Sequence, residues 1–168
     1  VIFVGSQSGT IYALDLDSGC AHWTYSAGAE VRSSLSLGQL PDRDDPVLYM
    51  GDFSATVHAI DASDGSLVWR ASVGDHTDAT ITGSPKLHDG ALYVPLSSSE
   101  WATAADPGYA CCTFRGGVVS VDAASGELNW RTHVIDEPAV ETGETNPFGA
   151  DRKGPAGAPV WNSPTIDA

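Results

Sequence analysis

The sequence predicts an all-β protein made of repeated sheets of four short antiparallel strands, and three observations predict it. An eleven-residue pattern, small-x-Asp-x-x-x-Gly-x-x-x-Trp, occurs three times in the 168 residues. Apolar residues alternate with other residues before each copy, which is the two-residue period of a strand with one buried face. A Trp, which is too large for repeated exposure to solvent, ends every copy. Repeated four-stranded sheets are typical of a β-propeller.

The three copies of the pattern each predict a hairpin. They occupy 13–23, 59–69 and 120–130. The Asp at the third position can accept hydrogen bonds from the backbone N–H groups of the turn. The Gly at the seventh position can adopt the positive φ that closes the turn. The residues after each Gly then begin the next strand.

Each predicted hairpin has further strand signals before it. Shorter apolar strands are expected at 1–4, 47–50 and 92–94. Ser-rich strand starts precede the second and third of these, and a fourth unit is expected to start at Asn162. We expect one Trp of each unit to lie buried where that sheet docks on the next. These residues are Trp23, Trp69 and Trp130.

The repeats predict an arc of blades rather than a closed ring. Propellers close with roughly four to eight blades, whereas three patterns and the start of a fourth unit give about three to four. The chain also starts inside one expected strand and stops just after another begins. We therefore expect 1–168 to be a partial propeller domain and a fragment of a longer chain.

Composition and cysteine spacing exclude several classes of partner and site. The formal charge of −14 and the pI near 4.3 argue against nucleic acid, whose phosphates attract Lys and Arg. No apolar run approaches the roughly 18 residues of a membrane span, and no signal-peptide pattern opens the chain. The three cysteines have no Cys-x-x-Cys spacing. The sequence therefore indicates neither a zinc site nor covalently attached haem c in this stretch.

Two inserts interrupt the regular repeats. The spacing between pattern Asp residues is 46 and then 61, so the third unit carries about fifteen extra residues, which fall in 97–113. A second insert, 135–155, follows Trp130. Both are rich in Pro, Gly, Ala, Asp and Glu, and we expect loops. Long loops on a rigid scaffold are where binding and catalysis tend to occur.

The eleven-residue pattern resembles the tryptophan-docking motif of the quinoprotein alcohol dehydrogenases. The resemblance implies a propeller, eight-bladed in that family, which holds pyrroloquinoline quinone (PQQ) and Ca²⁺ on its axis. Non-catalytic relatives such as the outer-membrane assembly lipoproteins keep the blades without the cofactor site. The motif alone therefore leaves open a protein-interaction or assembly scaffold.

The third unit is similar to the PQQ-site blade of that family. Thr80-Ile-Thr82-Gly-Ser-Pro, Ser98-Ser99-Glu100 and Arg115-Gly116 follow in the same order and at similar spacing. The resemblance implies that Thr82, Ser98 or Ser99, and Arg115 belong to the cofactor site, with Thr82 bonded to the quinone's carboxylates. It implies Glu100 as a Ca²⁺ ligand, and carboxylate oxygen suits this hard cation. A solvated loop carboxylate is the alternative for Glu100.

Trp161 and the adjacent pair Cys111-Cys112 resemble the two faces of the family's quinone slot. The segment around Trp161 is similar to the one whose indole forms the floor under the quinone, and an aromatic face stacks well on a planar ring. The alternative is a blade-packing Trp. The family places a vicinal disulfide over the quinone, which implies a Cys111–Cys112 bond, whereas two reduced cysteines are the alternative. The position of this pair resembles the polyvinyl alcohol dehydrogenase branch.

The resemblance implies a PQQ-dependent dehydrogenase that oxidises secondary alcohols in the periplasm or outside the cell. Its substrate would be an alcohol, polyol or polymer, and its electron acceptor a cytochrome-type partner. A haem c domain is possible on a part of the protein outside this chain. The family's catalytic Asp belongs to a later blade, so no catalytic residue is assigned within the 168 residues. The alternative is a non-catalytic scaffold, which needs none of Glu100, Cys111-Cys112 and Trp161.

Overall fold

The computed structural model describes residues 1–167 and is all-β, as the repeats predict. Named strands pair only in the antiparallel direction. Within the described residues the only helix is α1, Glu100–Thr103, a single turn. No helix of residues 1–167 is long and apolar enough to cross a membrane.

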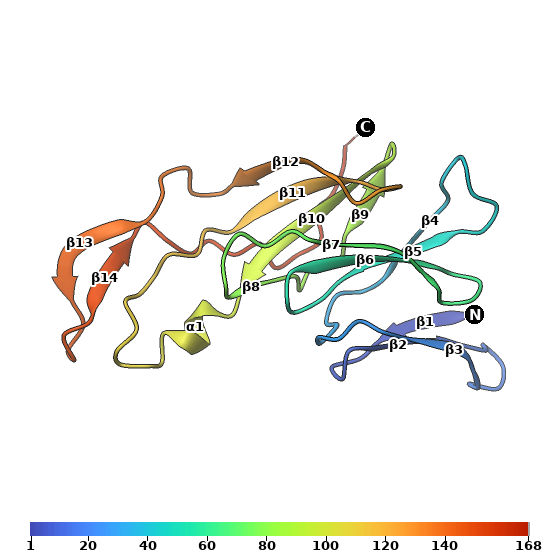
Figure 1. Ribbon diagram of the computed structural model, residues 1–168, viewed down its shortest axis with the longest axis horizontal. Coiled ribbons are helices and arrows are strands. Elements are labelled where there is room, and N and C mark those ends of the chain that lie inside the picture. The colour runs from blue at the N-terminus through green and yellow to red at the C-terminus, as the bar shows by residue number, and fades with distance from the viewer. Residues whose placement is uncertain (168) are drawn as a thin grey trace.

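Three sheets follow one another along the chain as blades (Figure 1). The first blade has the order β1-β2-β3, with strands Ile2–Gly5, Thr10–Leu14 and Ala21–Ser26. The second has the order β4-β5-β6-β7, with strands Ser36–Gly38, Val47–Gly51, Thr56–Asp61 and Leu67–Ser72. The third is built on β9, β10, β11 and β12, with strands Lys86–His88, Ala91–Ser98, Gly117–Asp122 and Leu128–His133. The short strand β8, Ala79–Thr80, pairs with the far end of β10.

The blades pack face to face through two apolar clusters. Strand β5 is buried along its whole length because it contributes to both clusters. Its Val47 and Tyr49 pack toward the third blade, whereas Leu48 and Met50 pack toward the first. This division follows from the two-residue period of a strand. The core therefore lies between the blades, as in a propeller arc.

The three turns of the repeat have the predicted hydrogen bonds. The Oδ1 atoms of Asp15, Asp61 and Asp122 accept hydrogen bonds from backbone N–H groups and Ser hydroxyls of their own turns. Gly19, Gly65 and Gly126 follow with φ of 70°, 77° and 78°. In each turn the Gly N–H donates to the carbonyl of the Asp four residues earlier. The prediction of three Asp-Gly hairpins is confirmed.

The turn Asp residues predict a loss of stability in acid. Hydrogen bonds from turn Ser residues hold the pKa of Asp15, Asp61 and Asp122 below the usual 3.8. Because these folded-state pKa values are depressed, their stabilisation is complete above pH 3.8 and is lost as the pH falls through the folded values. We expect Asp122→Asn to flatten the decline in unfolding free energy below pH 4 (about the unperturbed Asp pKa). Urea unfolding between pH 2 and 6 (roughly bracketing that pKa) measures this, and parallel declines for variant and parent would contradict it.

The pattern Trp residues dock one blade on the next, with one exception. The indole Nε1 of Trp23 donates to the carbonyl of Ala62 at 3.2 Å, and that of Trp69 donates to the carbonyl of Ala123 at 3.0 Å. Both rings are half-buried rather than buried. The expectation of a buried Trp130 is wrong, since this side chain is 44% exposed. No turn of a following blade covers it among residues 1–167.

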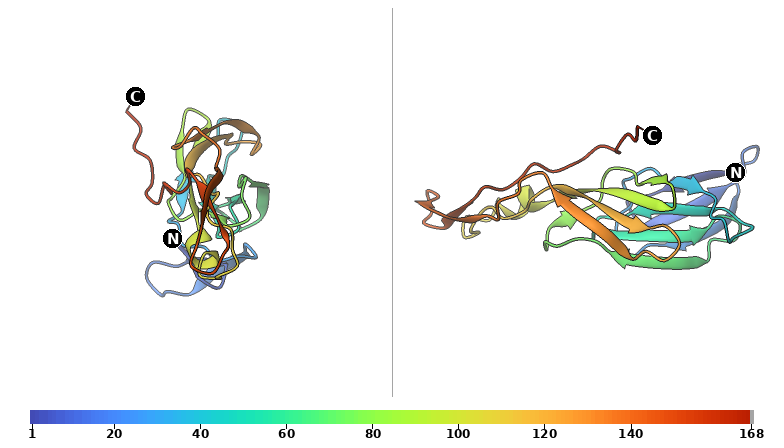
Figure 2. Two further views of the ribbon diagram at one scale, coloured as in Figure 1. Left: turned by 90° about the vertical axis from the view of Figure 1, so that its left-hand side faces the viewer. Right: turned by 90° about the horizontal axis from the view of Figure 1, so that it is seen from above.

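The inserts are more structured than the sequence predicts. The expectation of a loop over 135–155 is wrong, because it contains the hairpin of β13, Val140–Thr145, and β14, Asp151–Gly154. This hairpin projects from the third blade, at the opposite end of the molecule from the first blade (Figures 1 and 2). The insert 97–113 contains α1. From 155 to 167, where a fourth unit was expected to begin, the structure has no strand.

Candidate cofactor site

Two neighbouring cavities bring together most of the residues singled out from the sequence. The first, about 370 Å³, is lined mainly by apolar side chains, with polar groups from Ser98 and Glu100. Its walls include Trp101, Cys112, Phe114, Pro159 and Trp161. The second, about 320 Å³, is lined by Arg32, Phe53, Thr80, Thr82, Ser97, Ser98, Trp101 and Trp161. The shared residues Ser98, Trp101 and Trp161 make the two cavities adjacent.

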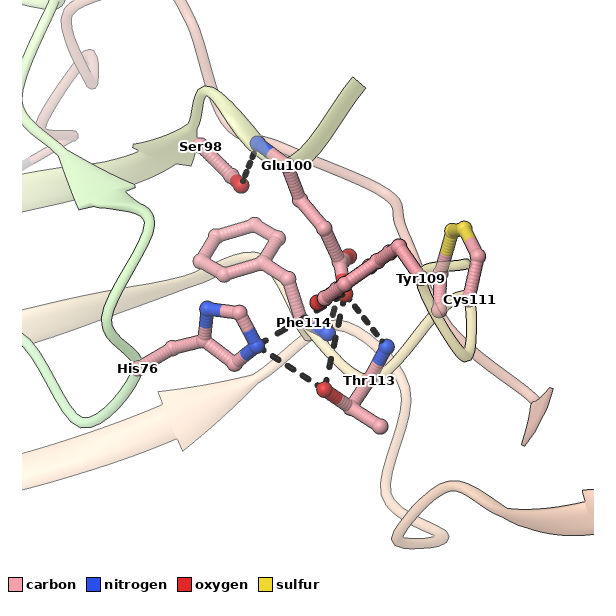
Figure 3. The surroundings of a disulfide bond; sticks show 8 residues. His76, Ser98, Glu100, Tyr109, Cys111, Thr113 and Phe114 are labelled. Atoms are coloured by element: carbon pink, nitrogen blue, oxygen red, sulfur yellow. Dashed lines mark hydrogen bonds and ion pairs between the residues drawn. A yellow bond between two sulfur atoms is a disulfide. The ribbon is translucent and has the colours of Figure 1, made fainter. Parts of the chain in front are cut away.

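Glu100 organises the loop that carries the cysteine pair (Figure 3). Its side chain is buried, with a residue exposure of 5%. Oε1 accepts hydrogen bonds from the Tyr109 hydroxyl at 2.9 Å, the Thr113 N–H at 2.7 Å and the Thr113 hydroxyl at 3.4 Å. Oε2 accepts one from the Phe114 N–H at 3.1 Å. The solvated loop carboxylate is therefore excluded, and the charge is held by donors of the loop itself.

Two aromatic side chains complete the surroundings of Glu100. The Nδ1 of His76 accepts the Asp78 N–H at 3.1 Å, so its Nε2 carries the proton and donates to the Thr113 hydroxyl at 2.9 Å. Burial, together with the hydrogen bond to Glu100 and the charge of Glu100, raises the pKa of Tyr109 above 10. Tyr109 therefore stays a neutral donor to the carboxylate.

Cys111 and Cys112 form a disulfide in the structure. The segment is fixed by backbone hydrogen bonds to β14, from Cys112 N–H to the Lys153 carbonyl at 3.2 Å and from Lys153 N–H to the Cys111 carbonyl at 2.6 Å. Cys112 forms part of the wall of the apolar cavity, together with Trp161. The remaining cysteine, Cys20, is exposed and free.

Thr80 and Thr82 present hydroxyl groups that are buried and have no hydrogen-bond partner in the structure. Both line the second cavity beside Arg32. The Arg32 guanidinium lies over the Phe53 ring, 4.5 Å from its centroid, and pairs with Glu30. A buried hydroxyl without a partner is costly. A polar ligand in this cavity would remove that cost.

Two residues of the predicted site point elsewhere. The Ser99 hydroxyl contacts the Asp78 carbonyl at 3.4 Å, and Ser99 does not line either cavity. The Arg115 guanidinium donates to the carbonyls of Ile135 and Asp136 at 3.3 and 2.7 Å. It thereby fixes the start of the second insert. Of the two serines, Ser98 lines the cavities, and its Oγ accepts the Glu100 N–H at 2.8 Å.

Several residues that line the cavities were not predicted from the sequence, among them Trp101, Phe114 and Arg32. Trp101 is 76% exposed and borders both cavities from α1, outside the docking pattern that drew attention to other Trp residues. Phe114 is fully buried between the Glu100 network and the apolar cavity. Arg32 reaches the second cavity from the segment before the second blade. Only the unusual position of Trp101 inside an insert was a usable signal in the sequence.

Within residues 1–167, no group of three or more His, Cys, Asp or Glu side chains is arranged to hold a metal ion. Ca²⁺ prefers six to eight oxygen ligands, roughly, at a single site. Glu100 has one lightly used oxygen, Oε2, because Oε1 already accepts three hydrogen bonds. These residues could therefore supply one Ca²⁺ ligand and would need others from outside the described part of the chain.

The chain is similar to known proteins in sequence and in fold. The family described as outer membrane protein assembly factor BamB matches residues 1–155. A polyvinylalcohol dehydrogenase from a Pseudomonas species is 38% identical over 169 residues, which cover 99% of this chain and 26% of that protein. A polyvinylalcohol dehydrogenase from Sphingopyxis sp. (strain 113P3) is 34% identical over 173 residues, with coverage of 99% and 26%. The chain thus spans about a quarter of the length of these relatives.

A solved structure shows the same fold. Quinohemoprotein alcohol dehydrogenase from Comamonas testosteroni superposes with a TM-score of 0.61 over 79% of this chain and 19% of that chain, at 23% sequence identity. At this identity the likeness speaks for the propeller fold alone. The match of the family model over residues 1–155 establishes the family, and the two sequence relatives agree with it. The chain belongs to the superfamily of PQQ-type β-propellers that includes the quinoprotein alcohol dehydrogenases.

Proposed function

We propose that this chain forms part of a longer propeller that binds PQQ and oxidises secondary alcohols. The observation that carries the proposal is the apolar cavity in which Ser98, Glu100, Cys112 and Trp161 meet. Trp161 lies 49 positions after Cys112 in the sequence and 63 after Ser98. The sequence relatives described as polyvinylalcohol dehydrogenases support an alcohol as the substrate. When bound, PQQ supplies the two-electron oxidant that converts a carbinol to a ketone.

The residues that line the two cavities support PQQ as the ligand. Trp161, Trp101 and Phe114 offer apolar and aromatic faces to a planar ring system. The unpartnered hydroxyls of Thr80 and Thr82 and the guanidinium of Arg32 suit carboxylate groups, which accept hydrogen bonds. Ser98 lies between the two environments, since it lines both cavities. Ser99 and Arg115 would act on the loops around the ligand instead of touching it.

We propose one Ca²⁺ ligand in this chain, the Glu100 carboxylate through Oε2. Its other oxygen is held by Tyr109 and Thr113, which would orient the carboxylate before any ion binds. The remaining ligands would come from the cofactor and from other blades of the complete protein. The catalytic base and any haem c would likewise lie outside residues 1–168. A cytochrome-type acceptor and a periplasmic or extracellular location complete the proposal.

The second candidate function is a non-catalytic scaffold of the kind suggested by the description of the matching family. A scaffold needs the blades and their docking Trp residues. A scaffold function does not require two unpartnered Thr hydroxyls that line a cavity. It also does not require the buried Glu100 carboxylate, which fixes the disulfide loop beside the apolar cavity. The site therefore favours the dehydrogenase.

We expect Trp161→Ala and the double variant Cys111→Ala/Cys112→Ala to weaken PQQ uptake by the complete protein. Stacking of two aromatic faces contributes about 0.5–1.5 kcal/mol beyond the buried area, and 1.4 kcal/mol corresponds to roughly tenfold in affinity. The Trp161 variant should therefore bind PQQ about tenfold less tightly. Equilibrium titration of the apoprotein, followed by absorbance or tryptophan fluorescence, gives the dissociation constant directly.

The matched control for the cysteines is Cys20→Ala, because Cys20 is free, exposed and in the turn of the first blade. It should bind PQQ as tightly as the parent. If the complete parent protein takes up no PQQ, the dehydrogenase proposal is wrong and the scaffold takes its place. If Trp161→Ala and Cys20→Ala bind PQQ equally well, the apolar cavity lined by Trp161 and Cys112 is not the cofactor site.

A further inference from the structure

A third cavity, larger than the other two, lies beside the apolar cavity, which is the proposed cofactor slot. The proposed binding of PQQ gives this third cavity no role. Its volume is about 490 Å³, and Cys112 and Ala156 form the wall that it shares with the apolar cavity. We refer to it as the hairpin cleft, because most of its lining comes from β13, β14 and the turn between them. The lining includes Thr142, Glu144, Asn146, Asp151, Arg152 and Lys153.

The hairpin is held in place over this cleft by specific hydrogen bonds. Lys153 in β14 exchanges two backbone hydrogen bonds with Cys111 and Cys112. At the hairpin turn, the Asn146 side-chain amide donates to the Pro107 carbonyl at 2.9 Å. The loop that carries the cysteine pair therefore holds the hairpin at two places. The hairpin turn is bound at Pro107 and the hairpin base at Cys111 and Cys112. Figure 1 shows β13 and β14 alongside the loop that follows α1.

Among residues 1–167, the hairpin contributes no residue to the two apolar clusters. All six residues of β13 are exposed. A hairpin without a buried apolar face is at best marginally stable by itself. An ordered polar hairpin tethered beside a cofactor slot is better explained by contact with a ligand.

The charge in the hairpin cleft indicates a neutral, hydroxylated ligand. The chain has a net charge of −14 and only eight Lys and Arg residues. Two of these, Arg152 and Lys153, line the cleft opposite two acids, Glu144 and Asp151. The cleft is therefore balanced in charge within an acidic chain, which favours neither a cation nor an anion. It offers both donors and acceptors, as a hydroxyl group requires.

We propose that the hairpin cleft binds the hydroxylated carbon chain of a polymeric alcohol next to the carbinol that is oxidised. This inference rests on the proposed function, since it names the substrate class of that same site. A polyvinyl alcohol chain carries a hydroxyl on every second carbon, so several hydroxyls meet the cleft at once. The shared wall at Cys112 and Ala156 allows one chain to continue from the cleft to the slot. Arg152 and Glu144 are the binding residues, and their side chains lie 3.6 Å apart.

The test compares three variants of the complete protein. Glu144→Ala/Arg152→Ala removes both partners of the exposed pair, so neither charge is left unpaired. Ala104→Phe fills the cleft from α1's end without removing a polar group, because Ala104 lines the cleft in helical geometry. The control, Lys86→Ala/Glu127→Ala, removes the same charges at two exposed positions that line none of these cavities.

The first measurement is equilibrium binding of polyvinyl alcohol to the protein without PQQ. We expect each cleft variant to bind the polymer about tenfold more weakly than the parent. Glu144→Ala/Arg152→Ala loses charge-assisted hydrogen bonds to the polymer, and Ala104→Phe loses the space that the polymer occupies. The control should bind like the parent. A parent that does not bind polymer, or cleft variants that bind it as the control does, would overturn the inference.

The second measurement is KM of the PQQ-loaded protein for the polymer and for a short secondary alcohol such as 2-butanol. The cleft variants should raise KM for the polymer about tenfold and leave that for 2-butanol within twofold, because a short alcohol occupies only the slot. Equal rises for both substrates would overturn the inference. PQQ uptake by the parent decides the proposed function separately, so failure of one proposal is distinguishable from failure of the other.

Discussion

Replacing Trp69 with Ala is expected to lower the free energy of unfolding by about 3–5 kcal/mol, the usual range for truncation of a packed aromatic side chain. The ring packs on the turn of the next blade, where a Cβ added to Gly126 would lie 2.5 Å from Cε3 of Trp69. Its Nε1 donates to the Ala123 carbonyl, and its ring centroid lies 6.1 Å from that of Tyr49. Ala would remove all three interactions at once. Urea unfolding followed by circular dichroism measures the loss.

The control is Phe148→Ala, since Phe148 is 76% exposed at the tip of the β13–β14 hairpin. This variant should change the unfolding free energy by less than about 0.5 kcal/mol, as surface substitutions usually do. A loss below about 1 kcal/mol for Trp69→Ala would mean that this residue does not dock the second blade on the third.

The repeat made the blades predictable from sequence. The eleven-residue pattern fixes an Asp, a Gly and a Trp at positions whose roles are local or involve only the next blade. The Asp61 carboxylate binds its own turn, and the Trp23 ring packs on Gly65 of the following hairpin. Because these interactions repeat with the pattern, one copy predicts the others. Trp130 departs from this rule because no further turn of the repeat packs on it among residues 1–167.

The hairpin of β13 and β14 was not predictable from the sequence for a physical reason. A strand is recognised by alternation between a buried and an exposed face, and all six residues of β13 are exposed. Gly143, with φ at 79°, also interrupts the regular register with β14. The base of the hairpin is held by backbone hydrogen bonds between Lys153 and the cysteine pair, which residue types do not reveal. Its turn is held by the Asn146 side chain, whose partner is a backbone carbonyl.

The proposed cofactor site was predictable in its residue types but not in its contacts. Ser98, Glu100, Cys112 and Trp161 meet at one cavity, as their likeness to the family motif implies. Strand β10 ends at Ser98 and α1 begins at Glu100, so Ser99 lies between the two elements. The sequence does not predict these ends to within one residue, and the choice between Ser98 and Ser99 depended on them. The partners of Glu100 include the backbone N–H groups of Thr113 and Phe114. Every residue except proline has such a group, so the sequence could not single them out.

Replacing Glu100 with Ala is expected to disorder the 109–114 loop and abolish measurable PQQ and Ca²⁺ uptake. The substitution leaves the N–H groups of Thr113 and Phe114 and the Tyr109 hydroxyl without their acceptor. A buried donor without a partner costs about 1–3 kcal/mol. The loop should therefore lose several kcal/mol, by this same order-of-magnitude reasoning. Amide hydrogen exchange at Thr113 and Phe114 measures the local loss directly.

Glu100→Gln separates the structural role of this residue from its proposed role toward the ion. A Gln side chain has one oxygen that can replace Oε1 as acceptor for Tyr109 and Thr113. Its amide NH₂ then faces the Phe114 N–H, which loses its acceptor. We therefore expect exchange at Phe114 to accelerate while exchange at Thr113 stays close to the parent's. Ca²⁺ uptake should fall, because Glu100 is the only carboxylate that residues 1–167 contribute to the apolar cavity.

The exposed Glu127 provides the matched control, since its carboxylate makes no hydrogen bond among residues 1–167. Glu127→Ala should leave amide exchange in the 109–114 loop, PQQ uptake and Ca²⁺ uptake at the parent's values. Unchanged exchange in Glu100→Ala would contradict the structural role of Glu100. Glu100→Gln could lose protection from amide exchange at Phe114 and still take up Ca²⁺ as the parent does. Glu100 would then have the structural role alone, because the ion would be held entirely by groups outside this chain.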